Sequence, residues 1–556
     1  MISLTVYGGC GTIGGNKILL EDHIHDTRLF FDFGTSFKVR EQFFEEYLKP
    51  RPGVGLLDLL EMEYGAYGHL LPPIEGIYRE DLVPPGDLWS RYREHRHYRE
   101  LPSLDGVIVS HAHVDHTGYI SFLRPEVPVY ASALSAFIAK AMQDSGMPDF
   151  EKEVCYLNPR AWQDGREGRG VLSPVKGKQI MRPYVFVDQP ELGAGASTFW
   201  QDTPGRKTLE PAGPQPVRVA GDGLGCRVGR LPARHYPVDH SIHGASAWAV
   251  ETSAGWVVYT GDLRLHGTRG EQTERFIAEA RALRPRALLC EGTRAPRRGD
   301  ETELEPPLIT EREVEDNAGR LVANEAGLVI ADFGPRNIER LQAFLRIAEA
   351  TGRALVILAK DAYLLDAMHL VDARIPAVST EANLRVYNDV KSMPGVWEKQ
   401  VRRSYKSSLV APDDIRSNPD RFILCFSFWD VKNLIDIAPT AGTYIYSSSE
   451  AYTEEQRMDI WRLRHWLEHF GLRGVGLPKT SDEDEADTPG QFQPGEELLH
   501  ASGHAGAGDL VALAKEIRPQ TLIPIHTENP RFFFQALAGE PVEILVPEYG
   551  ESIELS

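Results

Sequence analysis

The chain has 556 residues, of which 42% are hydrophobic and 25% are charged, close to the averages of globular proteins. These proportions exclude global disorder, a collagen-like chain and a disulfide-stapled miniprotein, and the length predicts about two to four domains. The net charge of −20 would repel a polyanion at long range, which argues against a passive, sequence-independent nucleic-acid binder. It argues less against a nuclease, because bound divalent ions dominate the local charge of such a site.

The sequence gives no indication of a membrane span, a signal peptide or disulfide bonds. No apolar run reaches the roughly 20 residues that span a bilayer, and residues 1–10 lack the features of a signal peptide. We therefore expect no membrane association and a cytoplasmic location. The five cysteines are widely spaced and form no Cys-x-x-Cys motif, so we expect neither a disulfide framework nor a thiolate zinc site.

Short β-rich pieces open the chain, and SLTVYGG, KILLED and RLFFDFG are predicted strands. The strand pattern stops at residues 38–102. This segment contains many charged residues and prolines, which indicate an inserted helical or loop region. We expect the histidines near the start of the chain to be exposed: His23, His25, His69, His95 and His97. LDGVIVS (104–110) predicts a buried strand, VPVYAS a further strand, and LSAFIAKAMQ a helix.

The middle of the chain is more irregular. Residues 156–216 are rich in glycine, proline and charge, and predict loops or a hairpin excursion. CRVGRLPARHYPVDHSIHGASAWAVET then alternates like strands around a polar turn. WVVYTGD (256–262) predicts a strand that ends in an acid.

From about residue 300 the pattern changes to alternating strands and helices, as in GLVIADFG, NIERLQAFLRIAEATG and ALVILAKD. This alternation predicts an α/β unit with a parallel sheet. TEEQRMDIWRLRHWLEHFG predicts a long helix. Residues 481–497 are acidic and poor in apolar residues, so we expect them to be mobile. The strand-like pattern returns in ELLHASGHA, TLIPIH and VEILVPE.

The strongest chemical signal is His111-x-His113-x-Asp115-His116, which directly follows a predicted buried strand. Neutral imidazoles and carboxylates bind zinc at about 2.0–2.2 Å. From the turn after the strand, His111 and His113 can point to one metal, and Asp115 and His116 can reach a second. Four ligand-type residues in six positions predict a metal centre rather than a solvated polar turn.

A metal centre needs further ligands from distant sequence. His240 lies in a predicted turn between strands, in PVDHSIHGA. Asp262 ends the strand VVYTGD, where a carboxylate can bridge two metals, and His526 ends the apolar strand TLIPIH. Each residue alone is an ordinary polar strand end, but together they supply one ligand each at the same edge of a sandwich.

These motifs resemble the metallo-β-lactamase fold. LLCEGT at Glu291, HASGH (500–504) and His526 narrow the resemblance to the β-CASP nuclease branch, and HASGHA and YIYSSS are similar to segments of ribonuclease J. The resemblance implies an α/β protein, an αββα metallo-β-lactamase sandwich with an inserted β-CASP α/β domain. We expect the sandwich to comprise residues 1–297 and 498–556, with the β-CASP domain at 298–497.

The resemblance also implies two divalent ions, with zinc favoured and manganese as the alternative, bridged by Asp262. One ion would be held by His111, His113 and His240, and the other by Asp115, His116 and His526.

Further roles follow from the same resemblance. Asp32 and Glu291 would be supporting carboxylates, Asp32 orienting a ligand histidine, and His504 would face the scissile phosphate. The candidate phosphate contacts are Ser447, Ser448, Ser449, Ser502 and Gly503. Because FILCFSFWD stands where relatives have a GSQGEP-type loop, recognition of a terminal phosphate and the direction of exonuclease action stay open. HTEN also replaces the usual HGE after the final ligand.

The resemblance implies a nuclease that hydrolyses RNA, with single-stranded RNA as the expected partner. Cleavage from an end and internal cleavage both remain open. Only about thirty residues follow His526, so we expect no separate C-terminal domain of the kind many ribonuclease J proteins carry, which leaves a homo-oligomer open.

Three alternatives stand beside this function. A DNA exonuclease of the same branch is the nearest. A small-molecule hydrolase is permitted by His-x-His-x-Asp-His alone, but the roughly 200 residues between Asp262 and His500 favour a polymer substrate. The intact ligand set argues against the third, a non-catalytic scaffold.

Overall fold

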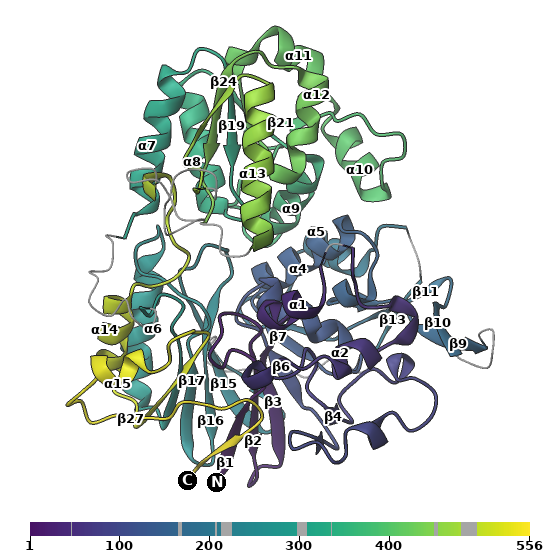
Figure 1. Ribbon diagram of the computed structural model, residues 1–556, viewed down its shortest axis with the longest axis vertical. Coiled ribbons are helices and arrows are strands. Elements are labelled where there is room, and N and C mark those ends of the chain that lie inside the picture. Colours follow the sequence, from purple (N-terminus) through teal and green to yellow (C-terminus); the bar gives the residue numbers. More distant parts are fainter. Residues whose placement is uncertain are drawn as a thin grey trace. The chain divides into compact units, whose positions relative to one another are not determined.

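The computed structural model describes residues 1–45, 47–164, 170–205, 208–212, 225–296, 308–334, 336–449, 454–479 and 497–556. The chain divides into two compact units (Figure 1). Unit 1 comprises Met1–Leu265, Arg269–Pro306 and His504–Ser556, and unit 2 comprises His266–Thr268 and Pro307–Gly503. The expected domain assignment stays a prediction, because compactness alone gives neither unit a role.

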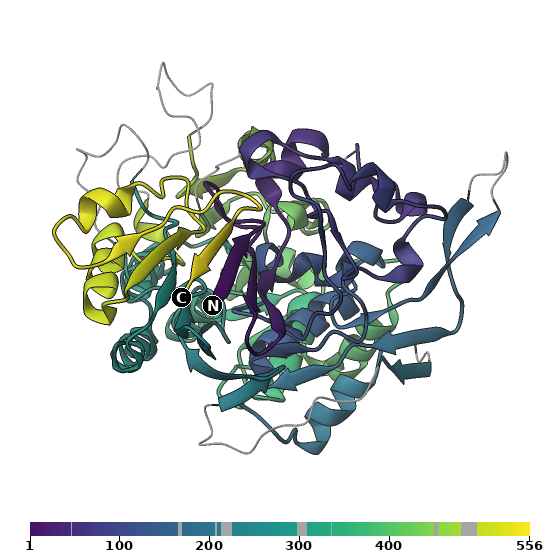
Figure 2. The ribbon, with the colours of Figure 1, turned by 90° about the horizontal axis from the view of Figure 1, so that it is seen from below.

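The first sheet of unit 1 contains the three strands predicted at the start of the chain. Its order is β12 (Tyr184–Phe186), β7 (Val129–Ala131), β6 (Gly106–Ile108), β3 (Thr27–Phe33), β2 (Lys17–Asp22), β1 (Ile2–Val6) and β28 (Ser552–Leu555). β28 pairs antiparallel with β1, so the two ends of the chain lie side by side (Figure 2).

The second sheet of unit 1 mixes hairpins with parallel strands. Its order is β14 (Gly225–Val228), β15 (Leu231–Pro237), β16 (Ser246–Thr252), β17 (Gly255–Tyr259), β18 (Ala287–Glu291), β26 (Thr521–Ile525) and β27 (Glu543–Ile544). β26, which comes after the whole of unit 2 in the sequence, pairs parallel with β18 from Ala287↔Thr521 to Glu291↔Ile525. This pairing returns the chain to unit 1.

Helices and the two sheets form layers. Apolar side chains of both sheets form one buried core, which includes the fully buried Trp248. On the other face of the second sheet, α6 (Gly270–Leu283) and α14 (Ala507–Ile517) pack on a further apolar cluster. At the edge of the first sheet, Phe137 of α4 (Ala133–Ser145) contacts Phe186 of β12. The helix predicted from LSAFIAKAMQ is therefore confirmed.

The segment 38–102 forms short elements, as predicted. It contains α1 (Phe37–Phe43, which begins one residue earlier), α2 (Leu57–Glu61), several 3-10 turns and the short pair β4 (Ile74–Glu75) and β5 (Arg99–Glu100). The expected exposure of its histidines is wrong for His69 and His97, which are 4% and 2% exposed. Both rings contact the ring of Tyr549, which follows β27 in the sequence.

The segment after residue 155 includes the expected hairpin, formed by β9 (Arg160–Asp164) and β10 (Gly170–Pro174). Two further strands of this region, β11 (Lys178–Met181) and β13 (Thr208–Pro211), pair parallel with each other. The last residues of the predicted excursion, 213–216, lie outside the described residues.

Unit 2 is built on a parallel sheet, as the alternating pattern predicted. Its order is β22 (Leu409–Val410), β21 (Leu384–Tyr387), β20 (Ala354–Ile357), β23 (Phe422–Cys425), β19 (Leu328–Asp332), β24 (Gly442–Tyr446) and β25 (Leu472–Val475). The predicted helices are α7 (Glu311–Asn324), α8 (Ile338–Ala350) and α13 (Glu454–His469). Thr310 and Glu313 form a capping box at the start of α7, which satisfies its first backbone N–H groups.

One strand prediction in this region is wrong. ELLHASGHA contains a 3-10 turn, Glu497–Leu499, followed by irregular backbone. The Leu499 carbonyl accepts hydrogen bonds from Ser447 Oγ and Arg340 Nη1, so side chains rather than a neighbouring strand satisfy it. The expected mobile segment 481–497 lies outside the described residues except for Glu497. None of the described helices is long and apolar enough to cross a membrane.

Candidate metal centre

The candidate ligands lie at the ends of strands in unit 1. His111 follows β6, Asp262 follows β17, and His526 follows β26. Because β17, β18 and β26 run parallel, their carboxyl ends meet at one edge of the second sheet. His113 is the N-cap residue of the short helix α3 (Val114–Thr117), which carries Asp115 and His116.

Two residues of the site, one supporting carboxylate and one ligand, have strained backbones. Asp32 in β3 and His526 have φ values of +54° and +51°, a region that non-glycine residues rarely occupy. Such conformations persist only where the surrounding structure holds them, and they cluster at functional sites. The His526 amide donates to the Gly9 carbonyl at 2.9 Å, which fixes the turn that aims the ring.

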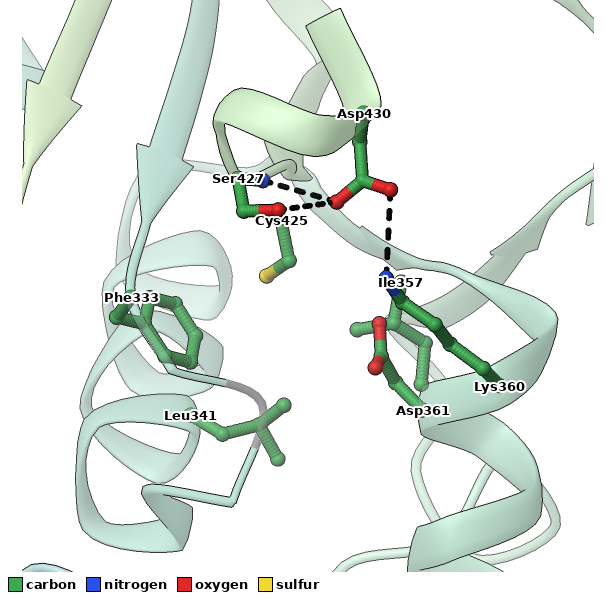
Figure 3. Close-up of a pocket in the computed structure, with 8 residues that line it drawn as sticks. All are labelled: Phe333, Leu341, Ile357, Lys360, Asp361, Cys425, Ser427 and Asp430. Carbon is green, nitrogen blue, oxygen red and sulfur yellow. Dashed lines mark hydrogen bonds and ion pairs between the residues drawn. The ribbon is translucent and has the colours of Figure 1, made fainter. Parts of the chain in front are cut away.

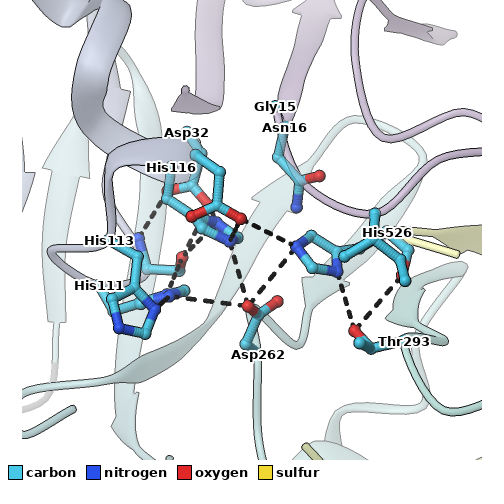
Figure 4. A network of polar contacts seen from close by, with 12 residues as sticks. Gly15, Asn16, Asp32, His111, His113, His116, Asp262, Thr293 and His526 are labelled. Atoms are coloured by element: carbon cyan, nitrogen blue, oxygen red, sulfur yellow. Dashed lines mark hydrogen bonds and ion pairs between the residues drawn. The ribbon is translucent and has the colours of Figure 1, made fainter. Parts of the chain in front are cut away.

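Asp32 organises the first group of ligands (Figure 4). Its carboxylate accepts hydrogen bonds from the Ser110 amide and hydroxyl, both at 2.7 Å, and from His116 Nδ1 at 2.7 Å. Since Ser110 Oγ gives its proton to Asp32, it accepts from His111 Nδ1 at 3.0 Å. The network therefore leaves Nε2 of His111 and of His116 as the ring atoms that face Asp262.

Thr293 orients the His526 ring in a similar way. Its hydroxyl donates to Glu291 Oε2 at 2.7 Å, so it accepts from His526 Nδ1 at 2.9 Å. His526 Nε2 then lies 3.4 Å from Asp115 Oδ2 and 3.6 Å from Asp262 Oδ2. Holding one ring nitrogen as a donor and directing the other inward is the usual arrangement around a metal-bound histidine.

The ligand-type atoms form overlapping groups whose members lie within 4.8 Å of one another. These groups are His111, His113 and His240; Asp115, His116 and His526; His111, His116 and Asp262; and His240, Asp262 and His504. The structure thus brings together all the metal-ligating residues expected from the sequence. Asp262 belongs to two of the groups named here, in keeping with the bridging position implied for it.

The electrostatics of the centre are those of a cation site. Burial lowers the pKa of His116, but Asp262, Asp115 and Asp32 together raise it well above the ordinary value. Burial and the neighbouring His116 and His113 hold the pKa of His111 well below its ordinary value. Burial raises the pKa of Asp262, yet His526 and His116 pull it far lower. Asp262 is therefore ionised among these histidines.

The residues fit a divalent cation. Asp262 is 2% exposed, and its Oδ1 has no hydrogen-bond partner among the residues the structure describes. Buried polar atoms without a partner are rare and call for an explanation, and a bound ion supplies one. Imidazole and carboxylate are the ligands that zinc takes in catalytic sites.

His504 and Glu291 form a separate pair beside the ligands. His504 Nδ1 lies 3.1 Å from Glu291 Oε2, and Glu291 Oε1 also accepts from the Leu263 amide at 2.8 Å. Burial lowers the pKa of His504, but Glu291 and Asp262 raise it above the ordinary value. Glu291 is fully buried at the end of β18 and so positions the His504 ring.

The candidate phosphate contacts lie in unit 2. Ser447 is 3% exposed, and its hydroxyl already donates to the Leu499 carbonyl at 2.6 Å. Ser448 and Ser449 are partly exposed, and the Ser449 carbonyl accepts from Tyr446. The Ser502 carbonyl accepts a hydrogen bond from His266 Nε2 at 3.0 Å. The role of these serines and of Gly503 stays a prediction.

The segment FSFWD (426–430), which the sequence analysis singled out, contributes Ser427 and Asp430 to the lining of a pocket of unit 2 (Figure 3). Ser427 donates to Asp430 through its hydroxyl at 2.6 Å and caps the 3-10 helix Phe428–Asn433. Lys360 Nζ lies 3.3 Å from Asp430 Oδ1 at the rim. The segment is thus a capped helical turn at the carboxyl end of β23.

Sequence reasoning missed three residues that hold the ligands. Ser110 and Thr293 each stand one or two positions from a predicted site residue, after a strand, and this placement is the signal that could have revealed them. The Tyr259 hydroxyl donates to Asp32 at 2.5 Å and receives a hydrogen bond from Asn16. Tyr259 belongs to an apolar strand and gives no such signal.

Known proteins resemble the chain in both sequence and fold. Residues 496–544 match the Zn-dependent metallo-hydrolase RNA specificity domain, RMMBL. Ribonuclease J of Sinorhizobium meliloti is 23% identical over 453 residues, or 79% of this chain and 60% of that protein. Ribonuclease J of Mycobacterium tuberculosis H37Rv is 24% identical over 479 residues, or 83% of this chain and 66% of that protein. The chain thus spans under two thirds of these relatives' lengths.

A crystal structure of a protein of unknown function from Enterococcus faecalis V583 has a similar fold. It covers 99% of both chains with a TM-score of 0.61 and 20% sequence identity. Fold and matches together define a protein with the metallo-β-lactamase/β-CASP fold. In sequence, the chain resembles ribonuclease J over most of its length. The RMMBL match supports a divalent metal at the site, zinc being the ion that its description names.

Proposed function

We propose that the protein is a metal-dependent nuclease that hydrolyses phosphodiester bonds of RNA with a water activated by two zinc-class ions. The observation that carries the proposal is the pair of ligand triads, His111–His113–His240 and Asp115–His116–His526. Asp262 contacts His111 of the first triad and His116 and His526 of the second. Two ions in such a site lower the pKa of bound water and neutralise charge on the phosphate. Unit 1 is then the metallo-β-lactamase domain and unit 2 the β-CASP domain.

The chain's own residues prepare the site for this reaction. Asp32, Ser110 and Thr293 fix the orientation of the ligand imidazoles through the hydrogen bonds described above. Glu291 holds Nδ1 of His504, so the ring keeps one orientation beside Asp262. His504 can then hydrogen-bond the substrate phosphate or give a proton to the leaving oxygen.

RNA is the proposed substrate because the RMMBL match, which includes both His504 and His526, carries an RNA-specificity description, and the relatives are named ribonuclease J. The hydrolytic centre alone does not choose between RNA and DNA, since both present the same phosphodiester. Discrimination requires contact with the 2′-hydroxyl. We expect single-stranded RNA to be the better substrate.

Matched single-stranded RNA and DNA, each with and without a 5′-phosphate, test the proposal. Purified protein with Zn²⁺ or Mn²⁺ should cut RNA faster, and Asp262→Asn, the matched inactive variant, should cut neither. The cleavage pattern of end-labelled RNA separates cutting from an end from internal cutting. Equal or faster cleavage of DNA would overturn the RNA assignment, and cleavage of neither polymer would overturn the nuclease assignment.

A further inference from the structure

A second cluster of metal-ligating side chains lies in unit 1, inside the 38–102 segment. Ligand atoms of Glu63, His69 and His95 lie within 4.8 Å of one another. Glu63 and His69 form an antiparallel bridge across a tight loop, and the Tyr64 amide donates to the Gly68 carbonyl at 2.9 Å. His95 comes from a different turn, about 30 residues later in the chain. Two separate loops therefore meet at this cluster.

His69 is prepared as a ligand. Its side chain is 4% exposed, and Nδ1 lies 2.9 Å from the Leu60 carbonyl. A carbonyl only accepts, so Nδ1 carries the proton and Nε2 of the neutral ring has a lone pair. That Nε2 is buried, and no described residue hydrogen-bonds to it. It faces Glu63 Oε2 at 3.9 Å, which places two electron-rich atoms opposite each other.

The distances are close to those around a small tetrahedral cation: one falls within the expected range and the other is about 0.3 Å longer. Zinc binds nitrogen and oxygen at about 2.0–2.2 Å, so two ligand atoms of a tetrahedral site lie roughly 3.3–3.6 Å apart. His95 Nε2 is 3.3 Å from Glu63 Oε2, and His69 Nε2 is 3.9 Å from the same oxygen. Glu63 is one-third exposed, which leaves room for water as a further ligand.

The surroundings also contain an unsatisfied histidine. His97 is 2% exposed, and neither of its ring nitrogens finds a hydrogen-bond partner within the described part of the chain. Its ring centre lies 5.5 Å from that of His95, and its backbone amide donates to His95 Nδ1 at 3.2 Å. For His95 Nε2 to bind a metal, the ring proton must move from Nε2 to Nδ1, and Nδ1 then no longer accepts from the His97 amide.

We propose that Glu63, His69 and His95 bind a zinc-class divalent ion at a site separate from the centre at Asp262. The ion joins the loop at 61–70 to the turn at 93–97 and so stabilises the 38–102 segment. It neutralises the charge of Glu63 and is bound by the lone pair of the buried His69 Nε2. The inference does not depend on the proposed nuclease activity.

Zinc content of the full-length protein tests the site. Wild type, His69→Gln and His95→Gln are equilibrated over a series of buffered free zinc concentrations, and bound zinc per chain is measured by mass spectrometry. Each variant should bind one zinc fewer than wild type, and the loss should add to that caused by Asp262→Asn, because distant sites are independent. The matched control is His25→Gln, which removes a half-exposed histidine paired with Asp22 at 3.0 Å.

Thermal unfolding supplies a second readout. Zinc should raise the melting temperature of the Asp262→Asn protein, and His95→Gln should remove that increase, since a ligand that binds only the folded state stabilises it. His95 is partly exposed, so its substitution leaves the core intact if His69→Gln fails to fold. Equal zinc content in wild type and His95→Gln would overturn the site, whatever the outcome of the RNA assay.

Discussion

Asp262 is the residue on which the two ligand triads converge. Its Oδ2 lies 3.1 Å from His116 Nε2 and 3.6 Å from the Nε2 atoms of His111 and His526. We expect Asp262→Asn to lower the content of both metals, because an amide lacks the charge that offsets two cations. His240→Ala should weaken mainly one. Metal analysis of both variants, with His25→Gln as the control, checks this. Normal metal content in Asp262→Asn would remove the bridging role.

His504 is expected to act in catalysis without being needed to bind the metals. Its Nδ1 is held by Glu291, and the two triads are complete without it. We expect His504→Ala to lower turnover by about 10²–10⁴-fold, the usual loss when a proton-transfer group is removed, with metal content near that of wild type. Glu291→Gln should change the pH profile of turnover, since it alters the partner of the same ring. Loss of metal from His504→Ala would reassign His504 as a ligand.

Asp332 in β19 of unit 2 predicts a pH dependence of stability. Burial raises its pKa to about 7, although Tyr444 donates a 2.6 Å hydrogen bond that opposes the shift. Since the folded pKa lies above the unfolded value, the contribution is fully present below about pH 4 and is lost as pH rises toward 7. At about 1.4 kcal/mol per pKa unit, the change is on the order of 4 kcal/mol.

Asp332→Asn should remove this slope while keeping an acceptor for Tyr444. Urea unfolding of unit 2, followed by hydrogen exchange of β19 and β24 from pH 4 to 7, measures it. Asp413→Asn, at an exposed carboxylate paired with Arg416, is the control and should keep the slope. An unchanged slope in Asp332→Asn would assign the titration to another group.

At the scale of elements, the contact between the end of β3 and α3 positions the ligand motif. The Gly34 amide donates to the Asn16 carbonyl, and Thr35 donates to Val114. A Cβ added at Gly34 would lie 1.7 Å from the Asp115 carbonyl oxygen, which is backbone and cannot turn aside. The absence of a side chain at Gly34 therefore lets α3 approach the sheet closely enough to bring Asp115 and His116 to the centre.

We expect Gly34→Ala to displace α3, destabilise unit 1 by about 1–3 kcal/mol and reduce metal content. Urea unfolding and metal analysis measure the two effects. Gly508→Ala is the matched control, because a Cβ there meets nothing within 4 Å, and alanine within α14 should be neutral or stabilising by about 0.5–1 kcal/mol. Full metal content in Gly34→Ala would mean that the ligands do not depend on this contact.

For the whole molecule, the net charge of −20 bears on how RNA would bind. Few phosphates can be neutralised by a broad positive surface, so few counterions should be released. For single strands the slope of log K against log salt is about −0.7 per phosphate contact, and we expect a slope no steeper than about −3. The His504→Ala protein, which should bind without efficient cleavage, allows the measurement. A slope beyond about −5 would indicate an extensive basic groove.

The local patterns predicted most elements because each carries its own signal. The period of apolar residues predicted β1 to β3, α7 and α13, and the spacing of His111, His113, Asp115 and His116 predicted a metal motif. ELLHASGHA was mistaken for a strand because buried Leu499 and Ala501 alternate with polar residues in an irregular segment. There the backbone is satisfied by side chains of distant residues, which no local pattern records.

Local residue patterns predicted the ligand types, their placement at strand ends, the α/β class and the resemblance to β-CASP nucleases. The tertiary contacts established which of these atoms meet. They brought His526 to Asp262 across more than 260 positions, placed Ser110, Thr293 and Tyr259 behind the ligands, and buried His69 and His97 near Tyr549. The physical reason is that hydrogen bonds and burial depend on the approach of segments far apart in sequence, whereas periodicity and motif spacing are local.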